Sequence, residues 1–153
     1  MKAKDAMTSP VVGVPLGTSL EEVARLMLEK RIGSVLVLDE EGRLAGIVTE
    51  SDFLKERGIP FSTFRAPVLL GRFLGREGLD HLLEEAKRTK VEEIMSAPVH
   101  AVGPEAPLSQ VLEIMLEYDV NHVPVVDAEG RPVGIITRFD LLRLLRPHLR
   151  PHL

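Results

Sequence analysis

The stretch that decides the fold is residues 46–52, which read GIVTESD, because the chain repeats it at residues 134–140 as GIITRFD. A second motif, MTSPV at residues 7–11, returns as MSAPV at residues 95–99. The steps from 46 to 134 and from 7 to 95 are both 88 residues, so the segments between the motifs align without a gap. A duplication this regular predicts two copies of one supersecondary unit that bury apolar faces against each other.

Each copy is predicted to begin with a strand and a helix. In the first copy a short extended piece at 11–14 is followed by Thr18 and Ser19, which suit the N-cap of a helix. We expect Gly33 to end that helix, because glycine adopts the left-handed conformation easily. The helix carries one apolar stripe at helical spacing, formed by Leu20, Val23, Ala24 and Met27.

A hairpin and a short helix complete each copy. The apolar run at 35–38 predicts a buried strand, residues 39–43 a turn, and residues 44–49 the returning strand. A short helix is predicted from Ser51 to Arg57. The second copy repeats these elements with a helical stripe from Leu108 to Met115, strands at 123–126 and 132–137, and a closing helix at 139–145.

Residues 58–89 match nothing in the repeat. Leu79, Leu82, Leu83 and Ala86 predict an amphipathic helix there. The segment is too apolar for a flexible tether, so we expect it to act as a lid or a subunit contact. The sequence divides into a first copy at 1–57, an insert at 58–89, a second copy at 90–145 and a proline-broken, frayed tail at 146–153.

The composition restricts the class of protein. The 153 residues are 44% hydrophobic and 27% charged, which is the balance of a globular protein. A net charge of −4 argues against nucleic acid as a partner. There is no cysteine, which excludes disulfides and thiolate chemistry. No signal peptide and no apolar run of about 18 residues is present, so we expect a cytoplasmic protein that does not bind membranes.

With both motifs at the same spacing in both copies, the chain resembles tandem CBS-domain proteins, also called Bateman modules. The resemblance covers 1–57 and 90–145. It implies a mixed α/β (α+β) fold of two βαββα units packed as a pseudo-twofold pair. It also implies two clefts for adenosine-containing ligands such as AMP, ADP, ATP, S-adenosylmethionine or NAD(H), and a homodimer.

The resemblance assigns residues to two predicted clefts, each drawing on both copies. The first cleft is predicted to use Met7, Pro10, Val12, Ile32 and Gly33 together with Ile135, Thr137, Arg138 and Asp140. The second is predicted to use Met95, Pro98, His100, Val120 and Asn121 together with Ile47, Thr49 and Asp52. An ionised aspartate can accept hydrogen bonds from both hydroxyls of a ribose. A threonine at the start of a helix suits a phosphate, and apolar walls suit a flat base.

Two simpler interpretations stay open. Thr49-x-x-Asp52 and Thr137-x-x-Asp140 are also capping boxes, in which both side chains only satisfy the first turn of a helix. Arg138, which has Glu50 as its counterpart, is either a phosphate-binding cation or a solvated arginine. If it binds phosphate, the first cleft is the better anion site.

The residues favour a regulatory protein over an enzyme. Nothing resembles a nucleophile elbow or an activated base, and His100 and His122 lack the spacing of a zinc site. We therefore predict a non-catalytic, metal-free sensor of adenine nucleotides that regulates an unidentified effector protein. The alternative is a structural dimerisation module with empty clefts, whose apolar insert docks a partner protein.

Overall fold

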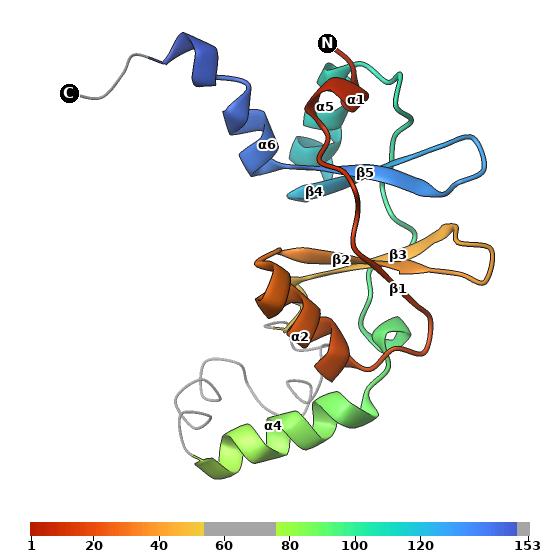
Figure 1. Ribbon diagram of the computed structural model, residues 1–153, viewed down its shortest axis with the longest axis vertical. Helices are drawn as coiled ribbons and strands as arrows, with labels where there is room; N and C mark the ends of the chain where they lie inside the picture. Colours follow the sequence, from red (N-terminus) through yellow and green to blue (C-terminus); the bar gives the residue numbers. More distant parts are fainter. Residues whose placement is uncertain (54–75, 150–153) are drawn as a thin grey trace. The chain divides into compact units, whose positions relative to one another are not determined.

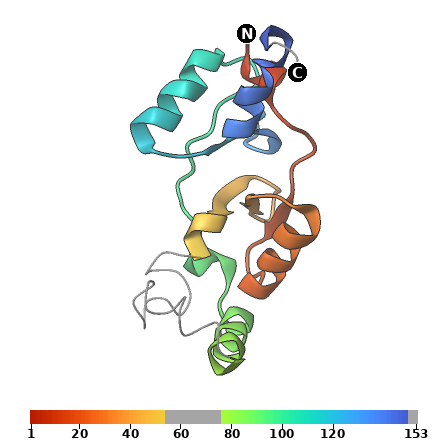
Figure 2. The same ribbon diagram turned by 90° about the vertical axis from the view of Figure 1, so that its left-hand side faces the viewer.

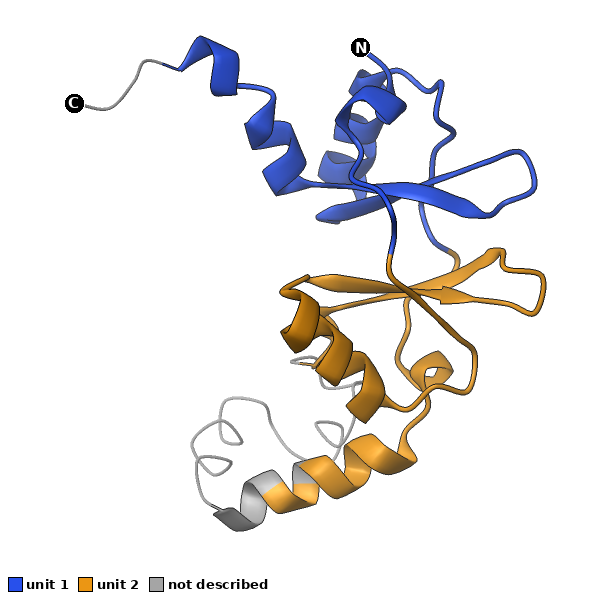
Figure 3. Ribbon diagram, in the orientation of Figure 1, with its two compact units in different colours: residues 1–11, 99–153 blue, residues 12–98 orange. Residues whose placement is uncertain are grey.

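The computed structural model describes residues 1–53 and 76–149, and the chain splits into two compact units. One unit comprises residues 12–98, and the other comprises residues 1–11 together with 99–153 (Figure 3). Both are mixed α+β, which confirms the predicted fold class. The units differ from the sequence repeats in one respect, because each opening segment lies with the body of the other copy.

The unit of residues 12–98 is built on a three-stranded sheet. Its strands are β1 (Gly13–Pro15), β2 (Ser34–Leu38) and β3 (Leu44–Thr49), in the order β1-β2-β3. Strand β1 is parallel to β2, and β3 is antiparallel to it. Helix α2 (Leu20–Lys30) lies against one face of this sheet, and a 3₁₀ turn, η1 (Glu50–Phe53), follows β3 (Figure 1).

Helix α2 forms where its sequence predicts, but it ends differently. Ser19 is the N-cap, and its Oγ accepts a hydrogen bond from the Glu22 N–H at 3.2 Å. The expectation that Gly33 ends the helix is wrong, because Arg31 is the C-cap, with φ 52° and its N–H bonded to the Met27 carbonyl. The Gly33 carbonyl instead accepts from the Glu50 N–H at 3.0 Å, which ties the start of β2 to η1.

The described part of the insert is helical, as predicted. Helix α4 (Arg76–Arg88) packs against α2, and Ala86 is buried in the same core (Figures 1 and 2). A 3₁₀ turn, η2 (Val91–Glu93), then adds Val91 and the following Ile94 to that core. The lid or subunit contact expected of the insert at 58–89 stays a prediction. Residues 58–75 of the insert, and the end of the short helix predicted to reach Arg57, lie outside the described residues.

The second unit has a smaller sheet. Its elements are α1 (Ala3–Ala6), α5 (Leu108–Tyr118), β4 (His122–Val126), β5 (Pro132–Thr137), α6 (Arg138–Arg143) and the 3₁₀ turn η3 (Arg146–His148). Strands β4 and β5 are antiparallel, and Val102 makes a parallel bridge to Val125 where β1 pairs with β2 in the other unit. Ala3 and Ala6 lie in the core with Val111, Val123 and Ile136.

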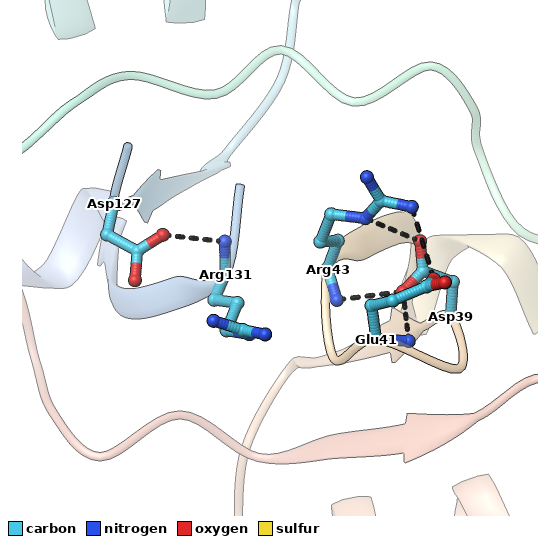
Figure 4. A network of polar contacts seen from close by, with 5 residues as sticks. All are labelled: Asp39, Glu41, Arg43, Asp127 and Arg131. Carbon is cyan, nitrogen blue, oxygen red and sulfur yellow. Dashed lines mark hydrogen bonds and ion pairs between the residues drawn. The ribbon is translucent and has the colours of Figure 1, made fainter. Parts of the chain in front are cut away.

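The hairpin turn of each unit is closed by an aspartate side chain at the equivalent position of the repeat. Oδ1 of Asp39 accepts the Arg43 N–H at 2.9 Å, and Oδ1 of Asp127 accepts the Arg131 N–H at 2.9 Å (Figure 4). The glycines of the turns have positive φ, 78° at Gly42 and 81° at Gly130. The two copies therefore share turn chemistry as well as strand order.

The opening segments are exchanged between the copies in matching registers. Thr8 from the first copy pairs with Ile135 in β5, with N–H···O distances of 2.8 and 3.1 Å. Ser96 from the second copy pairs with Ile47 in β3 at 2.9 and 3.1 Å. The exchange places each MTSPV-type motif beside the Thr-x-x-Asp motif of the other copy.

Candidate functional site

Asp140 is the centre of the polar group that the exchange creates. Its carboxylate is 4% exposed, and Oδ1 accepts a hydrogen bond from the Thr8 hydroxyl at 2.7 Å. Oδ2 accepts from the Thr137 N–H at 2.8 Å and from the Thr137 hydroxyl at 3.1 Å. Three polar groups from opposite ends of the chain thus converge at the start of α6.

The same contacts show that Asp140 caps α6. The Asp140 N–H donates to the Thr137 hydroxyl at 3.3 Å, which completes a capping box. Arg143 also pairs with Oδ1, at 3.0 Å, although its side chain is half exposed. Because Oδ2 is committed to the cap, Oδ1 is the oxygen that can exchange Arg143 or Thr8 for another donor.

An apolar surface adjoins this polar group. Met7 lies directly against Gly134, where an added Cβ would be 2.9 Å from the Met7 Cβ and would overlap its sulfur. Met7 and Ile135 are half-buried, and Pro10 is exposed. The Ser9 hydroxyl donates to the Val133 carbonyl at 2.6 Å, which fixes the segment beside β5. These side chains provide an apolar wall next to the Asp140 carboxylate.

Arg138 is a second exposed cation beside this group. It is the first residue of α6, and within residues 1–53 and 76–149 it makes no hydrogen bond or ion pair through its side chain. Its counterpart in the other copy is Glu50, the first residue of η1. A guanidinium at this place attracts an anion, whereas a carboxylate repels one.

The unit of residues 12–98 carries the corresponding arrangement. Asp52 is 3% exposed, and its Oδ2 accepts the Thr49 N–H at 2.8 Å. The Thr49 hydroxyl lies 2.9 Å from the Ser51 hydroxyl and 3.5 Å from Asp52 Oδ2. Met95 lies against Gly46 as Met7 does against Gly134. Pro98, also predicted for this cleft, belongs to the same unit and is exposed.

The remaining predicted residues belong in each case to the other unit. The three assigned to the first cleft, Val12, Ile32 and Gly33, belong to the unit of residues 12–98, and all three are half-buried. The three assigned to the second cleft, His100, Val120 and Asn121, belong to the other unit, where His100 and Asn121 are exposed. Their part in the two clefts stays a prediction.

Two residues of interest were missed by the sequence reasoning. Thr8 donates to Asp140, and the 88-residue spacing alone gives no sign of this because it does not reveal the exchange. Tyr118, at the end of α5, stacks on His100 with ring centroids 3.8 Å apart and an interplanar angle of 13°. Only tertiary structure brings those two rings together, so periodicity could not identify the pair.

The part of the chain that the structure describes contains no cluster of three or more histidine or acidic side chains able to hold a metal ion. None of its helices combines the length and apolar character that crossing a membrane requires.

Comparison with known proteins identifies relatives that are similar to this chain in sequence and fold. The chain is 31% identical to protein MJ1426 of Methanocaldococcus jannaschii, across 95% of this chain and 91% of that one. The crystal structure of the CBS domain pair of MJ0100, in complex with 5′-methylthioadenosine and S-adenosyl-L-methionine, matches with a TM-score of 0.70 and 26% identity, covering 97% and 98% of the two chains. The cytosolic domain of the Mg²⁺ channel MgtE in complex with ATP matches with a TM-score of 0.66 and 31% identity, covering 94% of this chain and 48% of that one.

Other relatives are longer proteins. The chain spans 32%, 22%, 23% and 33% of the next four curated relatives, some of which are enzymes. The family model for the CBS domain matches residues 3–58 and again residues 91–147. These two matches coincide with the duplicated motifs and with the exchanged opening segments described above. The chain belongs to the CBS domain family and contains two copies of that domain.

Proposed function

We propose that this protein is a non-catalytic regulator that binds an adenosine-containing ligand carrying phosphate. The observation that carries the proposal is the group of Thr8, Thr137 and Asp140 beside Arg138, whose side chain has no polar partner among the described residues. The adenosine-containing ligands in the structures of MJ0100 and MgtE support the ligand class. AMP, ADP, ATP and NAD(H) carry phosphate and fit better than S-adenosylmethionine, which has a positively charged sulfonium.

Arg138 is assigned to the phosphate on electrostatic grounds. A cation in the first turn of a helix opposes the helix dipole at a cost of about 0.3–1 kcal/mol, so helix stability does not explain its presence. A guanidinium forms strong charge-assisted hydrogen bonds with phosphate oxygens. Glu50 stands at the equivalent place in the other copy, so the group around Asp52 is the weaker phosphate binder.

Asp140 is assigned to the ribose through its Oδ1. A ribose hydroxyl can replace the Arg143 guanidinium there, since the Arg143 side chain is half exposed and regains water when released. The capping bonds from Thr137 to Oδ2 remain in place during this exchange. Capping and ligand contact therefore coexist in one carboxylate, with Met7 and Ile135 as an apolar wall for the base.

Regulation would follow from linkage between ligand and conformation. A ligand shifts a conformational equilibrium only by its differential affinity for the two states. The regulated partner is proposed to be an effector protein in the cytoplasm.

The test is thermal unfolding with AMP, ADP, ATP, S-adenosylmethionine and NADH, each added separately. A ligand present at a hundred times its dissociation constant stabilises the folded state by about 2.7 kcal/mol. We expect a phosphate-bearing compound to raise the melting temperature most. If none of the five compounds raises it, the proposal is wrong.

A second candidate is favoured by the apolar side chains exposed on one unit. Leu112 and Leu116 lie one turn apart on α5, and Leu116 is 85% exposed. Phe139 and Leu142 are exposed on α6 in the same unit. Exposed apolar residues that adjoin one another, as Leu112 and Leu116 do along α5, are typical of an interaction surface. We propose that a second copy of the chain covers them, and a homodimer is compatible with either ligand-filled or empty sites.

A further inference from the structure

Each opening segment places a methionine over a glycine of the neighbouring strand. A Cβ added to Gly134 in β5 would overlap the Met7 sulfur and lie 2.7 Å from the Met7 Cγ. A Cβ added to Gly46 in β3 would overlap the Met95 sulfur and lie 2.8 Å from the Met95 Cγ. Each pair lies within one compact unit, and both glycines are buried. The thioether of each methionine therefore fills the space that a side chain on the strand would occupy.

The backbone donors beside Met7 are already used. The Met7 N–H donates to the Ala3 carbonyl at 3.0 Å, and the Thr8 and Ile135 N–H groups bond the two segments to each other. The equivalent donors in the other unit have N–H···O distances of 2.9 to 3.1 Å and belong to Met95, Ser96 and Ile47. An oxygen on either sulfur that turned toward the strand would find no free donor among these backbone groups.

The five methionines differ in their access to solvent. Met1 is 71% exposed, whereas Met27 and Met115 are 8% and 9% exposed in the two cores. Met7 and Met95 are half-buried at the edges of those cores. The sequence contains no cysteine, so thioethers are the sulfur groups with which a peroxide can react. Met7 and Met95 thus combine partial exposure to solvent with contacts that fix the opening segments.

We propose that Met7 and Met95 are oxidation sites and that their sulfoxides loosen the opening segments from β5 and β3. Hydrogen peroxide supplies the oxygen. A sulfur lone pair attacks one peroxide oxygen, the O–O bond breaks, and the proton of that oxygen moves to the departing oxygen, which leaves as water. The sulfur gives two electrons to the peroxide and keeps an S–O bond. A methionine sulfoxide reductase reverses the change with two thiols, which become a disulfide as the oxygen leaves as water.

The consequence of oxidation at Met7 extends to Asp140 through Thr8. A sulfoxide is larger and more polar than a thioether, so it is disfavoured against a buried glycine. The adjacent Thr8 would lose its pairing with Ile135 and, with it, the 2.7 Å hydrogen bond to Asp140 Oδ1. The inference goes beyond the proposed function, because release of a segment is measured without any ligand.

Hydrogen exchange measured by NMR before and after treatment with hydrogen peroxide tests the proposal, with Met7→Leu and Met95→Leu as matched controls. Leucine has a similar volume and is not oxidised. We expect peroxide to speed the exchange of the Thr8 and Ser96 amides at least about fivefold in the wild type. Met7→Leu should respond only at Ser96, and Met95→Leu only at Thr8. Treatment with a methionine sulfoxide reductase should restore slow exchange in each protein.

Peptide mass spectrometry of the same wild-type samples provides a measurement that does not depend on the variants. The fraction of Met7 converted to sulfoxide should equal the fraction of molecules with fast exchange at Thr8. If Met7 and Met95 stay reduced at a peroxide dose that fully converts Met1, the proposal is wrong. Unchanged exchange after both residues are oxidised, or a response of both segments in either single variant, would overturn it as well.

Discussion

At the scale of single residues, the contact between Met7 and Gly134 links the opening segment to β5. A Cβ on Gly134 would lie 2.7 Å from the Met7 Cγ and 2.9 Å from its Cβ, too near the backbone for a rotamer change to relieve. We predict that Gly134→Ala destabilises the protein by about 1–3 kcal/mol, measured by urea unfolding. The matched variant Gly46→Ala should lower the free energy of unfolding by less, because its added Cβ would be 3.2 Å from the Met95 Cβ, compared with 2.9 Å between Gly134 and Met7. An equal or reversed order would contradict this packing.

The ion pairs of Glu105 predict that the stability of the folded protein depends on pH. Hydrogen bonds from Lys2 and Lys4 lower the pKa of Glu105 from its ordinary value of 4.5 to about 2. A carboxyl whose folded-state pKa is depressed stabilises the fold above the unfolded value and loses that contribution as pH falls. The stability difference between wild type and Glu105→Gln should therefore be constant above pH 4.5, shrink below it and vanish near pH 2.

Salt provides the control for this prediction. The lysine and glutamate side chains are solvent-exposed, so ions screen their attraction. We expect the difference between wild type and Glu105→Gln to shrink in about 1 M NaCl at neutral pH. A difference that is independent of both pH and salt would mean that Glu105 acts through packing instead.

The residue scale is also where sequence reasoning was weakest. The Thr137-x-x-Asp140 motif was predicted, and its capping role is observed directly. The donation from Thr8 to Asp140 joins positions 132 residues apart and leaves no local pattern in the sequence. The stack of Tyr118 on His100 also leaves no local pattern in the sequence, because it depends on where α5 ends in space.

At the scale of elements, the helix ends give a direct test of backbone strain. Arg31 and Asp119 end α2 and α5 with φ of 52° and 51°, in the left-handed region that costs a non-glycine residue about 1–2 kcal/mol. Replacing Arg31 by glycine relieves this strain, although glycine also increases the entropy of the unfolded chain by about 0.4–1 kcal/mol. We predict a net gain near 0.5 kcal/mol in thermal unfolding for Arg31→Gly.

The control is a neighbouring position without positive φ. Lys30→Gly replaces the last residue of α2 and should destabilise by up to about 1 kcal/mol, the cost of glycine in a helix interior. If both variants are destabilised equally, the left-handed cap at Arg31 is not a source of strain.

The elements themselves were largely predictable. Apolar runs bounded by turn residues gave β2 and β3, and the 88-residue spacing then located β4, β5 and α5 in the second copy. The end of α2 was misplaced because Gly33 looked like a better cap than Arg31, and the carbonyl of Gly33 is used by Glu50 instead. The preference of glycine for helix ends is a local property and does not reveal a hydrogen bond to a residue that is distant in the sequence.

At the scale of the whole molecule, the exchange of opening segments is the main feature that the repeat pattern could not predict. Periodicity shows that two copies exist, but the pairing of Thr8 with Ile135 and of Ser96 with Ile47 depends on chain topology. One consequence is local, because Thr8 of the first copy completes the polar group around Asp140 of the second.

The proposed homodimer makes a prediction at this scale. Leu116→Arg places a charge among the exposed apolar residues of α5 and should convert the dimer to a monomer in light scattering. Glu117→Arg, next to it on another face of the helix, should remain dimeric. A wild-type protein that is monomeric at every concentration tested would contradict the proposal.

The central claim is that Arg138 beside Asp140 binds the phosphate of a nucleotide, and calorimetric titration of ATP into wild type, Arg138→Glu and Glu50→Arg tests it most directly. Loss of a charge-assisted hydrogen bond, worth about 1.5–3 kcal/mol, predicts at least a tenfold weaker binding to Arg138→Glu. Glu50→Arg should bind as tightly as wild type or gain a second site. Wild-type affinity in Arg138→Glu, or no heat of binding in any of the three proteins, would contradict the account.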